Sequence, residues 1–192
     1  MSSLTRNASI LVFILLMAVM FVTRFHHFGS ALNLPDASMA VFFLGGLYLR
    51  RHWPFVALVV LAMGIDWAAI ALAGVSDFCV TPAYAFLPLA YAVLWYGARA
   101  YSPRLRGTAA SLVLAFAVAL ACASLSFMIS NGAFYWLGGR YAVPNMAEYL
   151  ARLWQWGPLF VRTTLAYIAV ALVLHAILAR LARTPSPILR AG

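Results

Sequence analysis

Long apolar stretches with almost no charge constrain this chain more than any other feature. The run from Ile10 to Val22, for example, contains no polar side chain. Of the 192 residues, 66% are hydrophobic and only 9% are charged, a balance that is not found in a soluble domain of this length. A bilayer-spanning helix needs roughly twenty apolar residues, so the chain has room for about six spans. We therefore predict an all-α integral membrane protein, with residues 1–192 forming a single bundle of six transmembrane helices.

Polar and proline-containing breaks delimit the predicted spans. A polar stretch runs from Arg24 to Asp36, a basic turn covers Arg50–His52, and Pro82 and Pro158 stand where first-turn prolines open helices. Pro88 predicts a kink inside the fourth span. The predicted spans cover residues 9–23, 37–49, 54–73, 82–98, 108–129 and 158–178.

The connection before the last span has a helical pattern of its own. Residues 146–156 place apolar Leu150 and Trp154 against polar Glu148 and Arg152 at helical spacing. This amphipathic pattern predicts a separate interfacial helix that covers one mouth of the bundle.

Arginine is distributed unequally between the two sides of the predicted bundle. The sequence has no lysine, and alternating assignment of the connections leaves only Arg24, Arg140, Arg152 and Arg162 on or near one side. The positive-inside rule makes the other, arginine-rich side cytoplasmic, so both termini are predicted in the cytoplasm of a bacterium and the chain in its inner membrane. These arginines lie at the ends of apolar runs and form no basic face, so no nucleic-acid partner is expected. The arginines assigned to the cytoplasmic side are Arg6, Arg50, Arg51, Arg99, Arg104, Arg106, Arg180, Arg183 and Arg190.

The reactive polar residues fall on the opposite, outer side. All the acids of the chain are there, together with a histidine pair and a loop cysteine. We therefore expect recognition or chemistry at the outer face. The residues are Asp36, Asp66, Asp77, Glu148, His26, His27, Cys79 and Tyr84.

Asp66 lies inside the third predicted span, where a carboxylate costs a few kcal/mol unless it is paired or hydrated. One interpretation is a functional site. The other is a carboxyl group that hydrogen-bonds to a neighbouring helix and fixes the packing. The sequence leaves both open.

Cys79 lies in a short connection beside Asp77, where water and a ligand can reach it. A thiolate at such a place can bind a transition metal. An inert thiol, half of a disulfide and one ligand of a zinc site are the alternatives, although no run of zinc ligands at recognisable spacing occurs. Serine-hydrolase, phosphate-loop and haem-attachment motifs are absent from the sequence.

His27, Tyr84 and Arg152 are ordinary residues when each is taken alone. An interfacial histidine often caps a helix or meets lipid headgroups, tyrosine is common in interfacial belts, and arginine caps the outer ends of many helices. Only their convergence on one mouth of the bundle makes them candidates.

Four segments of the chain together resemble the BtuM family of small cobalamin transporters of Gram-negative bacteria. That family is similar to the S-components of ECF-type vitamin transporters, which are six-helix bundles that bind a vitamin near the outer face. The most specific shared element is a solitary loop cysteine between an intramembrane aspartate and a tyrosine, here Cys79, Asp66 and Tyr84. The four segments are Arg24–Ser30, Asn33–Ser38, Gly64–Trp67 and Asp77–Tyr84.

The resemblance implies a site and a substrate. His27, Asp66, Tyr84 and Arg152 would surround a corrinoid, cobalamin or cobinamide, and Cys79 would be the axial ligand to its cobalt. One protein ligand is enough, because the corrin ring supplies the equatorial nitrogens of the metal. Thiolate donation from Cys79, with a thiol reductant present, is further expected to promote the decyanation of cyanocobalamin.

One feature departs from S-components that share an ECF energising module. Those proteins carry an A-x-x-x-A surface on the first helix, and the first span here has only Ala8 and Ala18. We therefore expect a solitary transporter without that module.

Two functions of other classes compete with corrinoid transport. One is a membrane-bound redox enzyme in which Cys79 reacts with a haem, quinone or thiol substrate. The other is a structural subunit without a ligand, in which Asp66 only fixes helix packing. A second redox cysteine beside Cys79 would favour the enzyme, and the sequence has none there.

Overall fold

The computed structural model describes residues 5–24, 34–78 and 80–181, and these ranges contain six α-helices, two short 3₁₀-helices and no strand. The predicted all-α fold is therefore confirmed for the described part of the chain. In chain order the elements are α1 (Arg6–Arg24), α2 (Ser38–Tyr48), α3 (Trp53–Ala73), η1 (Pro82–Phe86), α4 (Leu87–Tyr101), η2 (Ser102–Arg104), α5 (Ala109–Leu137) and α6 (Met146–Leu181).

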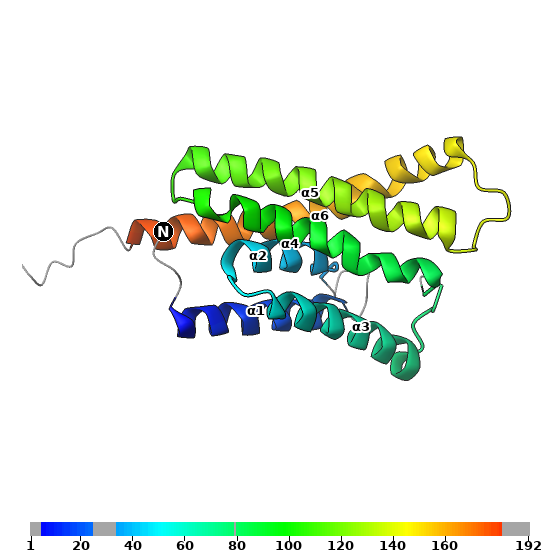
Figure 1. Ribbon diagram of the computed structural model, residues 1–192, viewed down its shortest axis with the longest axis horizontal. Helices are drawn as coiled ribbons and strands as arrows, with labels where there is room; N and C mark the ends of the chain where they lie inside the picture. The colour runs from blue at the N-terminus through cyan, green and yellow to red at the C-terminus, as the bar shows by residue number, and fades with distance from the viewer. Residues whose placement is uncertain (1–4, 25–33, 79, 182–192) are drawn as a thin grey trace, which may run out of the picture.

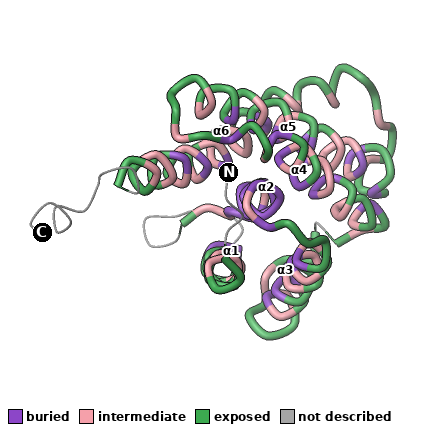
Figure 2. Tube along the Cα trace, turned by 60° about the vertical axis from the view of Figure 1, so that its left-hand side comes forward, coloured by how far each residue is buried: buried purple, intermediate pink, exposed green. Residues whose placement is uncertain are grey.

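The helices lie side by side along the long axis of the molecule, and the chain reverses direction from each helix to the next (Figure 1). α2 occupies the centre, with α1 and α3 on one side and α4, α5 and α6 on the other (Figure 2). It packs against α1, α3, α4 and α6. Nine of its 11 residues are buried, because the helix is apolar all round and therefore suited to the core.

Four helices, α1, α3, α5 and α6, are long and apolar enough to cross a membrane. Their outward faces carry large apolar side chains, such as Val22, Leu72, Val113 and Leu178, which are exposed over most of their surface. Apolar surface on this scale is unfavourable in water but suits lipid. The protein is therefore a multi-pass membrane protein.

Two of the proline-based predictions were wrong. Pro88 lies in the first turn of α4 and does not kink the middle of a span, since the segment from Pro82 to Phe86 forms the separate 3₁₀-helix η1. A proline is well placed in a first turn, where its missing N–H breaks no hydrogen bond. The fourth predicted span is therefore divided between two elements.

The predicted break at Pro158 is also absent. The interfacial helix expected at 146–156 and the span expected at 158–178 form one continuous helix, α6, with Pro158 inside it. The proline removes only one backbone hydrogen bond, and membrane helices tolerate this when neighbouring helices support them. Gly157, beside the proline, packs against Phe127 of α5, so a neighbouring helix supports α6 at this position. α5 likewise extends beyond its predicted end, to Leu137.

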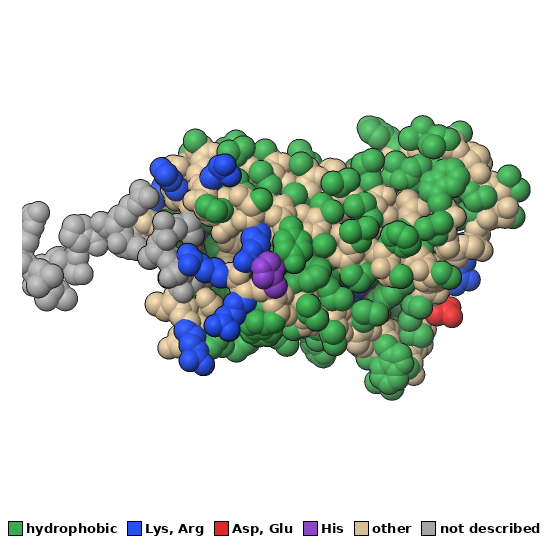
Figure 3. Space-filling view, in the orientation of Figure 1, with side chains coloured by type: hydrophobic (Ala, Val, Ile, Leu, Met, Phe, Trp, Pro, Cys, Tyr) green, Lys and Arg blue, Asp and Glu red, His purple; other side chains and the backbone are tan. Residues whose placement is uncertain are grey.

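Basic side chains gather at one end of the molecule, around the start of α1 (Figure 3). Arg99 of α4 holds the connection between α2 and α3 at this end, because its guanidinium donates to the backbone carbonyls of Leu49, at 3.3 Å, and Arg50. The predicted segregation of arginine is therefore present among the residues described. The arginines there are Arg6, Arg50, Arg51, Arg99, Arg104, Arg106 and Arg180.

Two glycines allow α2 to lie close to α4. A Cβ atom on Gly46 would overlap the backbone carbonyl of Trp95, and one on Gly45 would overlap the Trp95 ring. The Trp95 side chain is fully buried, so it has no free space into which to move. Small residues at such a contact let helix backbones approach each other.

We therefore predict that Gly46→Ala lowers the thermal unfolding midpoint in detergent by several degrees, because α2 must move away from α4. Gly64→Ala is the matched control, since a Cβ atom at Gly64 of α3 would meet nothing within 4 Å. Equal midpoints for the two variants would contradict the proposed close contact.

Candidate functional site

Arg24, the last residue of α1, is the centre of a buried polar cluster. Only 4% of the residue is exposed, although it carries a full charge. Its Nε donates to Asp66 Oδ1 at 2.7 Å and its Nη2 donates to Asp66 Oδ2 at 2.6 Å. This bidentate pairing is the strongest arrangement of a guanidinium and a carboxylate. Asp66 of α3 is therefore a paired intramembrane acid.

The remaining guanidinium nitrogen of Arg24 reaches α2, α4 and the segment before α2. Nη1 lies 2.9 Å from Ser38 Oγ, 2.8 Å from the Tyr91 hydroxyl and 3.2 Å from Asp36 Oδ2. Asp36 in turn accepts hydrogen bonds at Oδ1 from the backbone N–H and the hydroxyl of Ser38, at the start of α2. One arginine thus joins α1, α2, α3 and α4.

Tyr84 joins the same cluster from η1, where its hydroxyl donates to Asp66 Oδ2. Tyr84 belongs to η1 and Asp66 belongs to α3, and residues 74–81 connect these two elements. The hydrogen bond therefore anchors η1 against α3. Two of the predicted site residues, Asp66 and Tyr84, are therefore in direct contact. Their contact also agrees with the packing interpretation of Asp66, because both carboxylate oxygens accept hydrogen bonds within the protein.

Arg152 belongs to a second cluster, between α5 and α6. Its guanidinium carbon lies 4.9 Å from the ring centre of Tyr141 and 6.0 Å from that of Tyr135. The Tyr135 hydroxyl is 3.0 Å from Glu148 Oε2 and accepts a 2.8 Å hydrogen bond from the Asn145 backbone N–H. Arginine over aromatic faces is a favourable cation–π arrangement.

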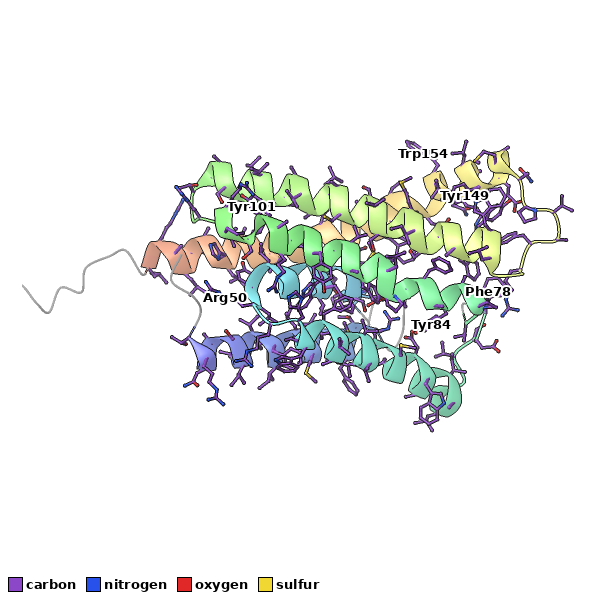
Figure 4. The ribbon with its side chains drawn as sticks, viewed as in Figure 1. Arg50, Phe78, Tyr84, Tyr101, Tyr149 and Trp154 are labelled. Atoms are coloured by element: carbon purple, nitrogen blue, oxygen red, sulfur yellow. The ribbon has the colours of Figure 1, made fainter. Side chains whose placement is uncertain are left out.

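Both clusters lie in the half of the molecule away from the arginine-rich end. In Figure 4, Tyr84, Phe78 and Tyr149 appear at one end, and Arg50 and Tyr101 toward the other. Phe78 packs against Phe134 of α5, with ring centres 5.6 Å apart. The connection before η1 thereby contacts the same end of α5 that carries the second cluster.

The other two predicted site residues, His27 and Cys79, lie outside the described residues. Within the ranges that are described, no group of three or more His, Cys, Asp or Glu side chains gathers to form a metal site. The structure therefore brings together Asp66 and Tyr84, and it places Arg152 in a neighbouring cluster at the same end.

Sequence reasoning missed Arg24, which has the most polar contacts among the described residues at this end. The sequence places it on the predicted outer side and in a segment that resembles the BtuM family, but gives it no role at a site. Its position at the end of an apolar run carries a weak signal, because a cation there needs a partner unless it reaches water. The partner, Asp66, is 42 residues away along the chain, so no local spacing could identify it.

Comparison with known proteins assigns no family. No known protein-family model matches the chain, and no curated protein sequence matches it. The function is therefore inferred from the residues of this chain and from the resemblance of its motifs.

The Arg24 cluster generates a stability prediction. Arg24→Gln should reduce the free energy of unfolding by about 3–5 kcal/mol, because Asp66 stays buried without its guanidinium partner. The double variant R24Q/D66N removes both charges and should recover a large part of that loss. Denaturation in detergent, followed by circular dichroism, measures both.

Arg6→Gln is the control for this series, since Arg6 is an exposed arginine at the other end of α1. It should change stability by less than about 0.5 kcal/mol. If R24Q/D66N were as unstable as Arg24→Gln plus Asp66→Asn added together, the two side chains would not be coupled, contrary to the geometry.

Proposed function

We propose that this protein takes up corrinoids, cobalamin or cobinamide, across the bacterial inner membrane as a solitary transporter similar to an S-component. The substrate binds near the periplasmic face, and both termini are cytoplasmic. The supporting observation is the pair formed by Asp66 and Tyr84 at the end of the bundle opposite the arginines. These are two of the residues that flank the solitary cysteine in the motif resembling the BtuM family.

The role proposed for Cys79 follows from ligand chemistry. A corrin ring occupies the equatorial positions of cobalt, so the protein has only an axial position to fill, and a soft thiolate suits this metal. His27, Asp66, Tyr84 and Arg152 contact the periphery of the substrate in this proposal. The cobalt is cargo and arrives with the substrate.

The proposed decyanation is a ligand exchange at cobalt(III). The Cys79 thiolate donates an electron pair to the metal, and cyanide leaves with the pair of its Co–C bond and takes a proton from water as hydrogen cyanide. No net oxidation or reduction occurs in this step. A thiol reductant keeps Cys79 as a free thiol before the exchange.

The Arg24 cluster supplies rigidity to this site. Asp66 is held at both oxygens by Arg24, so the direction of its bond to Tyr84 is fixed before any substrate arrives. A binding group that is already oriented loses less entropy on binding. Arg24 and Asp36 therefore act as positioning residues and need not touch the substrate.

The absence of an ECF module remains part of the proposal. The α1 sequence lacks the A-x-x-x-A surface, and the face of α1 around Leu11, Ile14, Leu15 and Val22 is covered with large exposed side chains. Large side chains hinder the close helix approach that small residues allow. Such a face fits lipid better than a closely packed helix of another subunit.

The first functional prediction concerns cobalt ligation. Purified protein mixed with cyanocobalamin and a thiol reductant should change the visible spectrum of the corrinoid as cyanide leaves. Cys79→Ser should abolish the change. Cys122→Ala is the matched control, because Cys122 packs against Gly97 between α4 and α5 and is given no part in binding. Conversion by Cys79→Ser at the wild-type rate would refute the proposed ligand.

The second concerns uptake and sidedness. A bacterium that lacks its own cobalamin uptake system and needs the vitamin should grow on cobalamin when it expresses this chain, but not the Cys79→Ser variant. In a Cys122→Ala background, a membrane-impermeant maleimide should label Cys79 from the periplasm. No growth on cobalamin when the strain expresses this chain, or labelling only from the cytoplasm, would overturn the proposal.

A further inference from the structure

Two buried polar atoms at the α5–α6 end of the molecule have no hydrogen-bond partner among the described residues. These atoms are Nε of Arg152 and Oδ1 of Asn131. An unpaired buried polar group costs roughly 1–3 kcal/mol, and more when the group is charged. Two such atoms in one region indicate a place where a polar ligand completes the structure.

Arg152 also lacks the acidic partner that its helix offers. Glu148 precedes it by four residues, the spacing and order that best favour a Glu–Arg pair on a helix. The Glu148 carboxylate is instead within hydrogen-bond distance of the Tyr135 hydroxyl, at 3.0 Å, and of Asn145 Nδ2. Among the described residues, the ion pairs involve only Arg24 with Asp36 and Asp66. The positive charge of Arg152 is therefore not neutralised within the described part of the chain.

The packing of α5 on α6 brings Asn131 to the level of Arg152. Tyr149 of α6 lies beside Gly132 of α5, and Gly157 of α6 lies beside Phe127. The two helices run in opposite directions, so the turns between Tyr149 and Gly157 lie alongside those between Phe127 and Gly132. Arg152 and Asn131 occupy these intermediate positions.

The aromatic rings beside Arg152 orient its guanidinium. Tyr141 and Tyr135 approach it at 4.9 and 6.0 Å, and the two rings are 4.6 Å apart. Stacking against ring faces leaves the N–H groups at the edge of a guanidinium able to donate. These groups form a fork that matches two oxygens of a phosphate or carboxylate.

We propose that Arg152 forms a binding subsite for the phosphate oxyanion of a phosphodiester, and that Asn131 Oδ1, which can only accept a hydrogen bond, takes one from a donor group of the same ligand. Naming cobalamin as the source of this phosphodiester rests on the proposed function. Cobalamin carries a phosphodiester in its nucleotide loop, and cobinamide does not. A phospholipid headgroup offers the same chemistry. The site thus distinguishes the two corrinoids through a group remote from cobalt.

The first experiment tests the oxyanion site without a corrinoid. Thermal unfolding of the full chain in an uncharged detergent is compared in inorganic phosphate and in chloride at equal ionic strength. Phosphate should raise the midpoint of wild type by a few degrees, as expected for a ligand that binds only the folded state. Arg152→Gln should lose this increase, and Arg152→Lys should keep part of it. No phosphate effect in wild type would overturn the proposal.

Arg140→Gln is the matched control. Arg140 is an exposed arginine at the same end, over the Phe78 ring at 5.0 Å, and its loss changes the net charge equally. It should retain the phosphate effect. If Arg140→Gln abolished the effect as Arg152→Gln does, general charge at this end would be responsible and the specific site would be refuted.

The second experiment identifies the source of the phosphate. Binding of cobalamin and of cobinamide is titrated with the same variants. Arg152→Gln should weaken cobalamin about tenfold and cobinamide by less than about twofold, since a charge-assisted hydrogen bond is lost only with the former. Unchanged binding of both would assign the site to a lipid headgroup, and equal weakening of both would place Arg152 against the corrin ring that they share. Either result would overturn the assignment of the cobalamin phosphate. Phosphate stabilisation without binding of either corrinoid would overturn the proposed function and leave the oxyanion site standing.

Discussion

The structure depends on one buried ion pair, Arg24 with Asp66. A guanidinium and a carboxylate taken out of water regain their solvation cost only if nearly all their hydrogen-bonding groups are satisfied. The partners of Arg24 come from α2, α3, α4 and the segment before α2, so these elements must all be in place together. In lipid, where the hydrophobic effect gives little preference between helix faces, such a polar centre specifies which helices meet.

The two ends of the bundle are chemically different, and α2 explains how the end that carries the Arg24 cluster is supported. The short, apolar α2 fills the centre, and its glycines allow close contact with α4. Its first residue, Ser38, already belongs to the Arg24 cluster. The packed core and the polar cluster are therefore consecutive on one helix, so a shift of either is transmitted directly to the other.

The clusters around Arg24 and Arg152 differ in how their charges are satisfied. The Arg24 guanidinium is surrounded by oxygens of the protein, whereas Arg152 has aromatic rings beside it and an unpartnered Nε. The first arrangement suits a group that orients others, and the second suits a group that binds something from outside. This contrast is the basis for assigning positioning to Arg24 and ligand contact to Arg152.

The sequence by itself determined the lipid environment, the helical content and the segregation of arginine, because each depends on local composition over roughly twenty residues. It also identified Asp66 as an acid that needs an explanation. The predictions made from Pro88 and Pro158 alone were wrong, because packing against neighbouring helices decides whether a helix starts, bends or continues at a proline.

Only the tertiary structure decided the partners. That Arg24 pairs with Asp66, and that Glu148 bonds to Tyr135 and leaves Arg152 without an ion pair among the described residues, depends on distances between side chains on different helices. Hydropathy and spacing describe one helix at a time, so they contain no information about such pairs. Asp66, Tyr84 and Arg152 were thus readable from the chain as candidates, but the central place of Arg24 and the division of these residues between two clusters were not.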